Sequence, residues 1–204
     1  MAKIYLLRHG VTEWNAAGDR YCGLTDIDLS KQGGIQAERA AAYLKDIQFD
    51  AAYSSTLCRA YNTAQTIARK HNLCIQKDDR IVEADFGLWE GKTRTEFEQE
   101  DPQSWEAWVK DPKSNPAGKT GETAEKIFSR MKSFFDEISK NHPDETVLVV
   151  AHSTVNRIYI AGALEMPFKH YRRLYQENTG INIFDLEKDS FKLLHMNVAE
   201  HLND

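Results

Sequence analysis

Four basic side chains stand at or shortly after the ends of apolar, strand-like runs in this chain: Arg8, His9, Arg59 and His152. In α/β proteins, ligands bind beyond the carboxyl ends of the parallel strands, so these side chains are expected to meet at one edge of a sheet. The helices that follow such strands begin at the same edge, and their N-termini favour anions. Each residue alone fits a structural histidine or a solvated arginine. Their joint placement predicts an oxyanion site.

Arginines and a neutral histidine in one site point to phosphoryl transfer. Two guanidinium groups can bind the non-bridging oxygens of a phosphoryl group bidentately and stabilise the charge that spreads over it in the transition state. A neutral histidine can attack phosphorus, and neighbouring positive charge keeps its ring unprotonated near neutral pH. The resulting phosphohistidine divides the transfer into two easier steps.

A leaving alkoxide also needs a proton, which a carboxylic acid near the site can supply. The stretch DRIVEADFGLWEG offers three candidates, Glu83, Asp85 and Glu90. The apolar neighbours of Glu83 favour a neutral acid, whereas burial of Glu83 as the structural partner of an arginine is the alternative. Spacing alone does not choose among the three.

The elements that must position these residues alternate between strand-like and helix-like runs. Strands are predicted over residues 3–8, 49–55, 146–153, 180–186 and 191–196. Helices are predicted over residues 36–47, 57–71, 122–142 and 155–164, the first of them capped by Ser30. This alternation is typical of a layered α/β fold with a largely parallel sheet.

One segment interrupts the alternation, in a chain that we expect to form a single domain over residues 1–204. Residues 92–123 hold two tryptophans together with several prolines and glycines. This composition predicts an inserted, partly helical cover. A lid over the site and a plain surface excursion are both open interpretations.

Composition limits the class of protein. The 204 residues are 41% hydrophobic and carry a net charge of -5, which is not the basic footprint of a nucleic-acid-binding protein. The three cysteines, Cys22, Cys58 and Cys74, show no CxxC spacing, so no disulfide framework or zinc knuckle is predicted. The first apolar run is too short for a signal peptide, and no run has the length of a membrane span. We therefore expect a cytoplasmic protein without nucleic-acid or membrane partners.

Five motifs together carry a resemblance to a known family. RHGVTEWN, YCGLTDIDLSKQGG, SSTLCRA, IVEADFGLWEG and VVAHS occur in this order. In this respect the chain resembles the histidine phosphatase superfamily, in its phosphoglycerate mutase-like branch. The resemblance implies a three-layer α/β/α sandwich with a mostly parallel central sheet, and a phosphohistidine mechanism that needs no metal or other cofactor.

The resemblance also assigns roles to residues that match the family's motifs. It implies that His9 is the nucleophile and that Glu83 first protonates the leaving group and then activates water. The resemblance implies that the phosphate is held by Arg8, Asn15, Cys22, Gly23, Arg59, His152 and Ser153. Of these, Arg8 and His152 are also implied to take part in catalysis. Ser153 stands where the family usually has glycine. Its hydroxyl can contact phosphate or cap a helix, and capping is the favoured interpretation.

The length of segment 92–123 distinguishes the phosphatases of this family from its mutases. It resembles small phosphatases, such as α-ribazole phosphatase or metal-independent phosphoserine phosphatase, more than the mutases, which carry a longer insert. The chain is therefore expected to hydrolyse a small phosphorylated metabolite, with cofactor-dependent phosphoglycerate mutase as the alternative. A zinc site of His9, His152 and Glu83 is disfavoured because Arg8 and Arg59 would repel the cation. An inactive phosphate-binding module would lack a core residue, and all are present.

Substrate and assembly are less determined. Several aromatic and basic residues are candidates for the rim of the site: Trp14, Tyr21, Trp89, Trp105, Trp108, Lys113, Lys119, His170, Arg172 and His201. For each of them, surface or core packing is the alternative interpretation. An exposed edge strand near Phe191 would allow a homodimer.

Overall fold

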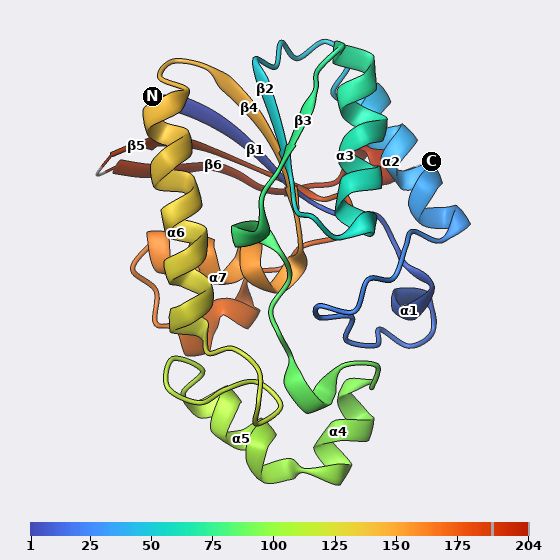
Figure 1. Cartoon of the computed structure of the whole chain (residues 1–204), viewed down its shortest axis with the longest axis vertical. Helices are drawn as coiled ribbons and strands as arrows, with labels where there is room; N and C mark the ends of the chain where they lie inside the picture. Colours follow the sequence, from blue (N-terminus) through green and yellow to red (C-terminus); the bar gives the residue numbers. More distant parts are fainter. Residues whose placement is uncertain (189, 204) are drawn as a thin grey trace.

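A six-stranded sheet with helices on both faces forms the centre of the protein (Figure 1), in a computed structural model that describes residues 1–188 and 190–203. The strands are β1 Ala2–Arg8, β2 Ala51–Ser54, β3 Ile75–Lys77, β4 Thr146–Ala151, β5 Ile181–Glu187 and β6 Ser190–Val198. They lie in the order β3-β2-β4-β1-β5-β6. Strands β1 to β4 are parallel to one another, β5 is antiparallel to β1, and β6 is antiparallel to β5. The expected three-layer sandwich with a mostly parallel sheet is confirmed.

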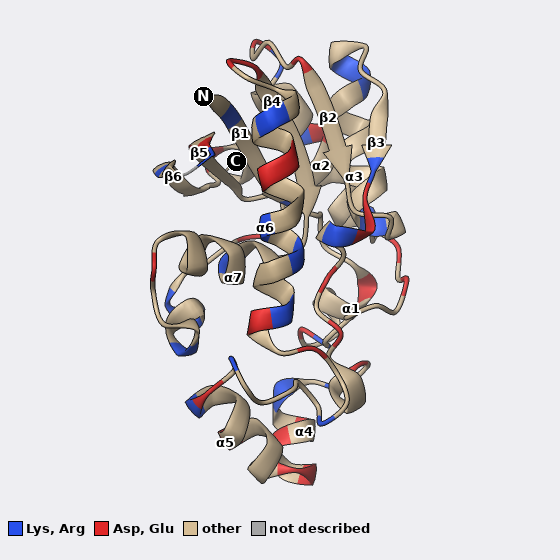
Figure 2. Ribbon diagram, turned by 60° about the vertical axis from the view of Figure 1, so that its left-hand side comes forward, with Lys and Arg blue, Asp and Glu red and all other residues tan. Residues whose placement is uncertain are grey.

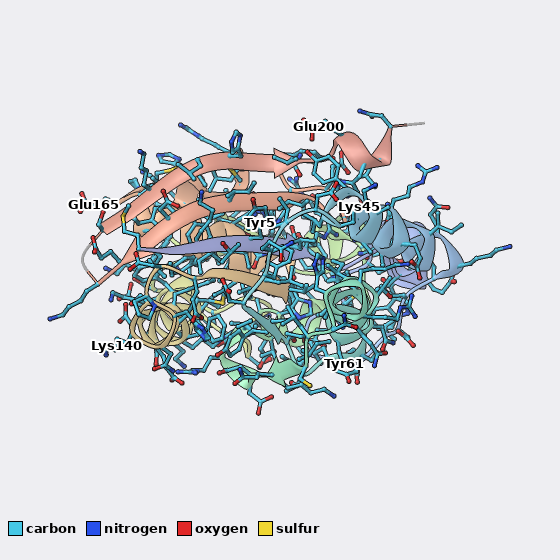
Figure 3. All side chains as sticks on the ribbon, turned by 90° about the horizontal axis from the view of Figure 1, so that it is seen from above. Tyr5, Lys45, Tyr61, Lys140, Glu165 and Glu200 are labelled. Atoms are coloured by element: carbon cyan, nitrogen blue, oxygen red, sulfur yellow. The ribbon has the colours of Figure 1, made fainter. Side chains whose placement is uncertain are left out.

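The helices divide between the two faces of the sheet. Helices α2 and α3 cover one face and α6 and α7 the other, and the view from above shows Tyr61 of α3 and Lys140 of α6 on opposite sides (Figure 3). The α-helices are α1 Glu13–Ala16, α2 Lys31–Tyr43, α3 Cys58–Ala68, α4 Arg94–Glu100, α5 Pro102–Lys110, α6 Ala124–Asn141 and α7 Ser153–Ala163. Short 3-10 helices are η1 Arg69–His71, η2 Asp79–Ile81, η3 Gly87–Trp89, η4 Phe168–Arg173 and η5 Glu200–Leu202.

Two apolar clusters hold the layers together. Along β1, Ile4 and Leu6 face the cluster under α6 and α7, whereas Leu7 faces the cluster under α2 and α3. This is the alternation that the period of a strand requires. On α6 an apolar stripe at helical spacing is buried, namely Ile127, Met131, Phe134, Phe135 and Ile138. Full burial of one such side chain is worth about 1.5–3 kcal/mol, so the stripe anchors α6 to the sheet.

The segment 92–123 holds α4 and α5, which lie beyond the carboxyl end of the sheet (Figure 1). Thr93 begins α4 with a capping box, and the Asp101 side chain caps α5. The two helices enclose a buried aromatic cluster of Trp89, Phe97, Trp105 and Trp108. Three of the proposed rim residues, all tryptophans, are therefore mainly packing residues of this cover.

The sequence did not predict β3. This strand has three residues, two of them exposed, which is too short for a period of two to be recognised, and it pairs with β2. None of the helices in the described part of the chain is both long enough and apolar enough to cross a membrane. Acidic and basic residues are interspersed over the elements (Figure 2), so positive charge at a site must come from a local cluster.

Candidate active site

A cavity of about 200 Å³ lies beyond the carboxyl ends of β1 and β4. Its walls are rich in arginine and carry only two carboxyl groups. The described residues that line it are Arg8, His9, Asn15, Asp19, Arg20, Tyr21, Cys22, Arg59, Glu83, Phe86, Ser153, Thr154, Arg157, Arg172, Tyr175 and Gln176. None of the lining residues comes from segment 92–123, so this cover supports the wall from behind.

Strand register brings the two predicted histidines together. Arg8 is level with Ala151 across β1 and β4, and the His9 N–H donates to the Ala151 carbonyl (3.1 Å). The residues that follow both strands are therefore neighbours, and the ring centroids of His9 and His152 are 5.1 Å apart. The joint placement that the sequence predicted is present.

The His9 ring is fixed in one tautomer. Its Nδ1 lies 2.7 Å from the Gly10 carbonyl oxygen, and because a carbonyl only accepts, Nδ1 carries the proton. The lone pair of the neutral ring is then on Nε2. Burial, together with the charges of Arg59 and Arg8, holds the pKa of His9 well below its usual range, so the ring is neutral.

Arg8 and Arg59 are held by backbone carbonyls. The fully buried Arg59 donates from Nη1 to Thr25 (2.9 Å) and from Nη2 to Gly23 (2.7 Å), and Arg8 donates from Nη1 to Gln176 (3.0 Å). Among the ion pairs of the described residues, neither guanidinium has a carboxylate partner. Both line the cavity, so their charge is available to an anion.

His152 lies beneath the cavity wall. It is fully buried, its Nε2 is 2.8 Å from the Ser55 hydroxyl, and its Nδ1 has no hydrogen-bond partner among the described residues. Burial, with the nearby charge of Arg59, holds the pKa of His152 well below its usual range. His152 is thus a neutral ring beside His9 that does not itself line the cavity.

Of the three candidate acids, only Glu83 lines the cavity. Its Oε1 accepts from the backbone N–H groups of Ala84 (2.9 Å) and Val155 (3.3 Å), and its Oε2 accepts from Thr154 (3.4 Å) at the start of α7. The arginine that approaches Glu83, Arg130, binds the Glu83 backbone carbonyl and not its carboxyl group. The alternative of a structural ion pair is therefore wrong.

The two rival acids are used elsewhere. Asp85 accepts from the Gly87 N–H (2.8 Å), and Glu90 accepts from Leu24 (2.9 Å) and from the Thr25 hydroxyl (2.7 Å). Both carboxyl groups brace loops next to the cavity. Of the three acidic residues in this motif, only Glu83 is therefore left at the cavity.

The remaining predicted site residues lie around Arg8 and Arg59 and differ in whether they line the cavity. Asn15 and Cys22 line the cavity, and the Asn15 Oδ1 accepts from Thr12 in the capping box of α1. Gly23 is not on the wall. Its carbonyl holds Arg59, its φ is +51°, and a Cβ there would fall 1.9 Å from Oε1 of Glu90.

Ser153 corrects one expectation. His152 occupies the N-cap of α7, and Ser153 is the first helical residue and lines the cavity. The Ser153 hydroxyl therefore does not cap the helix, and the favoured interpretation was wrong. Of the rim candidates, Tyr21 and Arg172 line the cavity. Arg157, which also lines the cavity, was not predicted from the sequence, although its place one turn after Ser153 on α7 puts both on the same face of the helix.

Thr179 and His201 support the backbone of Arg8 and His9 from behind the cavity. The Thr179 N–H donates to the carbonyls of Arg8 (3.1 Å) and His9 (3.3 Å), although Thr179 has φ of +59°, which is uncommon for a β-branched residue. Its hydroxyl lies 2.7 Å from the Asn178 carbonyl, to which it must donate. The same hydroxyl therefore accepts from Nε2 of His201 (3.0 Å). His201, a rim candidate, supports the site from behind.

The geometry defines a class of site, in which a neutral histidine with an available lone pair adjoins two arginines that form no ion pair among the described residues. Such a site suits phosphate binding and covalent transfer. The comparisons give the family. Residues 4–199 match the model of the histidine phosphatase superfamily (branch 1). Phosphoserine phosphatase 1 of Hydrogenobacter thermophilus is 34% identical over 204 residues, which cover 100% of this chain and 96% of that protein.

Two other relatives are similar over most of the chain. Glucosyl-3-phosphoglycerate phosphatase of Mycobacterium tuberculosis is 31% identical over 180 residues, covering 84% of this chain and 79% of that protein. A crystal structure of phosphoserine phosphatase from Entamoeba histolytica in complex with 3-phosphoglyceric acid is 32% identical, with a TM-score of 0.90, and covers 99% of this chain and 100% of that chain.

This chain belongs to the histidine phosphatase superfamily. It is a phosphatase and not a mutase, and it hydrolyses small phosphorylated molecules through a phosphohistidine. The predicted resemblance to the small phosphatases of this family is confirmed.

Proposed function

We propose that His9 is the residue that becomes phosphorylated and that Arg8, Arg59 and His152 hold the phosphoryl group. One observation carries this assignment: the Nδ1–H bond to Gly10 leaves the lone pair of His9 on Nε2, in a cavity lined by Arg8 and Arg59, neither of which forms an ion pair among the described residues. Asn15, Cys22, Gly23 and Ser153 complete the pocket, through side chains or backbone. A preorganised positive cluster of this kind stabilises charge without reorganisation during the reaction.

The reaction then has two steps. Nε2 of His9 attacks phosphorus while the bond from phosphorus to the ester oxygen breaks, and Glu83 gives its proton to the leaving alkoxide. In the second step Glu83 takes a proton from water as the water oxygen attacks phosphorus. The bond from nitrogen to phosphorus breaks, inorganic phosphate leaves, and His9 and protonated Glu83 are restored. The contacts of Glu83 with the start of α7 support this role because they hold its carboxyl group at the cavity wall.

The relatives suggest the substrates to test first. They are named for phosphoserine and glucosyl-3-phosphoglycerate, and one was solved with 3-phosphoglyceric acid. We propose phosphoserine as the first candidate for this chain, acted on in the cytoplasm. We also infer a homodimer formed through β6, which lies at the edge of the sheet. Sedimentation of the protein at micromolar concentration tests the dimer, and a monomer at all concentrations would exclude it.

The test of the proposed chemistry is phosphate release, in EDTA, from a panel of phosphomonoesters that includes nitrophenyl phosphate. His9→Ala is expected to abolish turnover of every ester, while His195→Ala, at an exposed position on β6, keeps wild-type rates. Mass spectrometry of the quenched wild-type enzyme is expected to show a phosphoryl adduct on His9. Turnover by His9→Ala above a few per cent of wild type, or an adduct on another residue, would refute the assignment.

A further inference from the structure

The cavity wall carries more arginines without an ion-pair partner among the described residues than the two that are proposed to bind the phosphate. Besides Arg8 and Arg59, its wall carries Arg157 and Arg172, and among the ion pairs of the described residues neither has a carboxylate partner. Arg20, in contrast, is bound to Glu96 through two nitrogens at 2.8 and 3.1 Å. A half-buried cation without a counter-ion is unfavourable, so the second pair of arginines needs an explanation.

Arg172 is fixed in place by aromatic side chains. Its Nη2 donates to the Tyr21 hydroxyl (2.9 Å), and its guanidinium carbon lies 4.3 Å from the ring centroid of Trp105 in the cover. Burial raises the pKa of Tyr21, so this hydroxyl stays neutral and does not compensate the charge of Arg172. The guanidinium group of Arg172 is thus oriented by neutral partners, so its positive charge can interact with an anion in the cavity.

Arg157 approaches the same aromatic ring from α7. Its Nε donates to the Ser153 carbonyl (3.0 Å), and its guanidinium carbon lies 5.3 Å from the Tyr171 ring centroid. The Arg172 carbon lies 5.6 Å from that centroid. Both cations are therefore gathered around Tyr171, whose hydroxyl accepts from the buried Trp108 (3.3 Å). Both residues also line the cavity, so an anion bound there can interact with both charges.

We propose that Arg157 and Arg172 form a second anion subsite that binds the carboxylate of the substrate, while Arg8 and Arg59 bind its phosphate. The substrate is then a phosphomonoester of a small hydroxy acid, an inference that rests on the phosphatase chemistry proposed above. Guanidinium groups that lie against rings and already give one nitrogen to a protein oxygen present an in-plane edge, which matches a planar carboxylate. The cavity of about 200 Å³ suits a small substrate.

The test compares two esters that differ only in the carboxylate, phosphoserine and phosphoethanolamine, with nitrophenyl phosphate as a generic third. The wild-type enzyme is expected to have a kcat/KM for phosphoserine at least tenfold above that for phosphoethanolamine. Arg157→Gln and Arg172→Gln are each expected to lower kcat/KM for phosphoserine about 10- to 100-fold, the size of a lost charge-assisted contact. For the other two esters kcat/KM is expected to change less than about threefold, which also shows that the variants are folded.

Two controls separate the subsite from general electrostatics and from the chemistry. Arg20→Gln removes a cavity arginine that already has an acidic partner, and it is expected to leave the preference for phosphoserine unchanged. Tyr21→Phe removes the hydroxyl that orients Arg172 and is expected to weaken only phosphoserine hydrolysis. Equal losses on phosphoserine and phosphoethanolamine would overturn the carboxylate subsite. Absence of phosphate release from all three esters by the wild-type enzyme would instead overturn the proposed chemistry.

Discussion

Replacement of Glu83 by glutamine tests the division of the reaction into two proton-dependent steps. In the folded protein Oε1 of Glu83 accepts two backbone N–H groups, at 2.9 and 3.3 Å, and Oε2 accepts one at 3.4 Å. An amide can keep its oxygen at the first position and place its NH2 group at the second. The variant then loses one long hydrogen bond, which costs about 1 kcal/mol. Glu83→Gln should therefore fold and bind phosphate normally.

Its kinetics should depend on the leaving group. A positioned general acid contributes about 10²- to 10⁴-fold, so kcat/KM for phosphoserine, whose alkoxide needs a proton, is expected to fall by that factor. Nitrophenolate leaves without a proton, so kcat/KM for nitrophenyl phosphate is expected to stay within about threefold of wild type. The second step needs Glu83 as a base for either ester. Rapid-mixing experiments with nitrophenyl phosphate should therefore show a burst of one nitrophenolate per active site, followed by slow turnover.

The control is Glu106→Gln, which changes an exposed carboxyl group on α5 and should leave both rates unchanged. The reasoning about the acid fails if Glu83→Gln lowers kcat/KM equally for the two esters. A loss of nitrophenyl phosphate turnover without any burst would contradict the second step, because it would mean that phosphorylation itself is slow.

Three further predictions concern the support of the site. Because the folded pKa of His9 and His152 lies well below 6.5, the unfolded chain binds more protons as the pH falls below 6.5, and the free energy of unfolding should decrease there by up to about 1.4 kcal/mol per pH unit for each histidine. Urea denaturation at several pH values measures this slope, and a stability independent of pH between 7 and 5 would contradict it. Gly23→Ala, at φ +51° and with its Cβ against Glu90, should destabilise the Arg59 loop by about 1–3 kcal/mol and lower kcat/KM, whereas Gly34→Ala, where a Cβ meets nothing within 4 Å, should not lower either quantity. Thr179→Val removes the hydroxyl that joins the Asn178 carbonyl to Nε2 of His201 and should lower kcat, while Thr179→Ser keeps both contacts and should retain it; equal rates in the two variants would refute this support.

The sequence by itself determined the order of the strands and helices of the sheet layers except β3, and it indicated the chemistry proposed for Arg8 and His9. Arg8 and His9 stand at the end of a short apolar run that indicates a buried strand, and the apolar stripe of α6 repeats at helical spacing. These patterns are local, because burial of one face of a helix or strand determines the spacing of apolar residues that are close in the sequence. The expectation that side chains after parallel strands meet at one edge relied on a general rule of α/β topology, and the His9–His152 distance agrees with it.

Only the tertiary structure decided which groups keep their charge available. The sequence could not choose among Glu83, Asp85 and Glu90, because the choice depends on loops that bring Gly87 and Thr25 to the other two carboxyl groups. It did not single out Arg157, because an arginine on a helix is usually solvated. Whether an arginine is paired depends on residues far away in the chain, as with Arg172 and Tyr21, which are 151 positions apart. Long-range contacts of this kind leave no periodic signal, since they arise from packing of elements already formed.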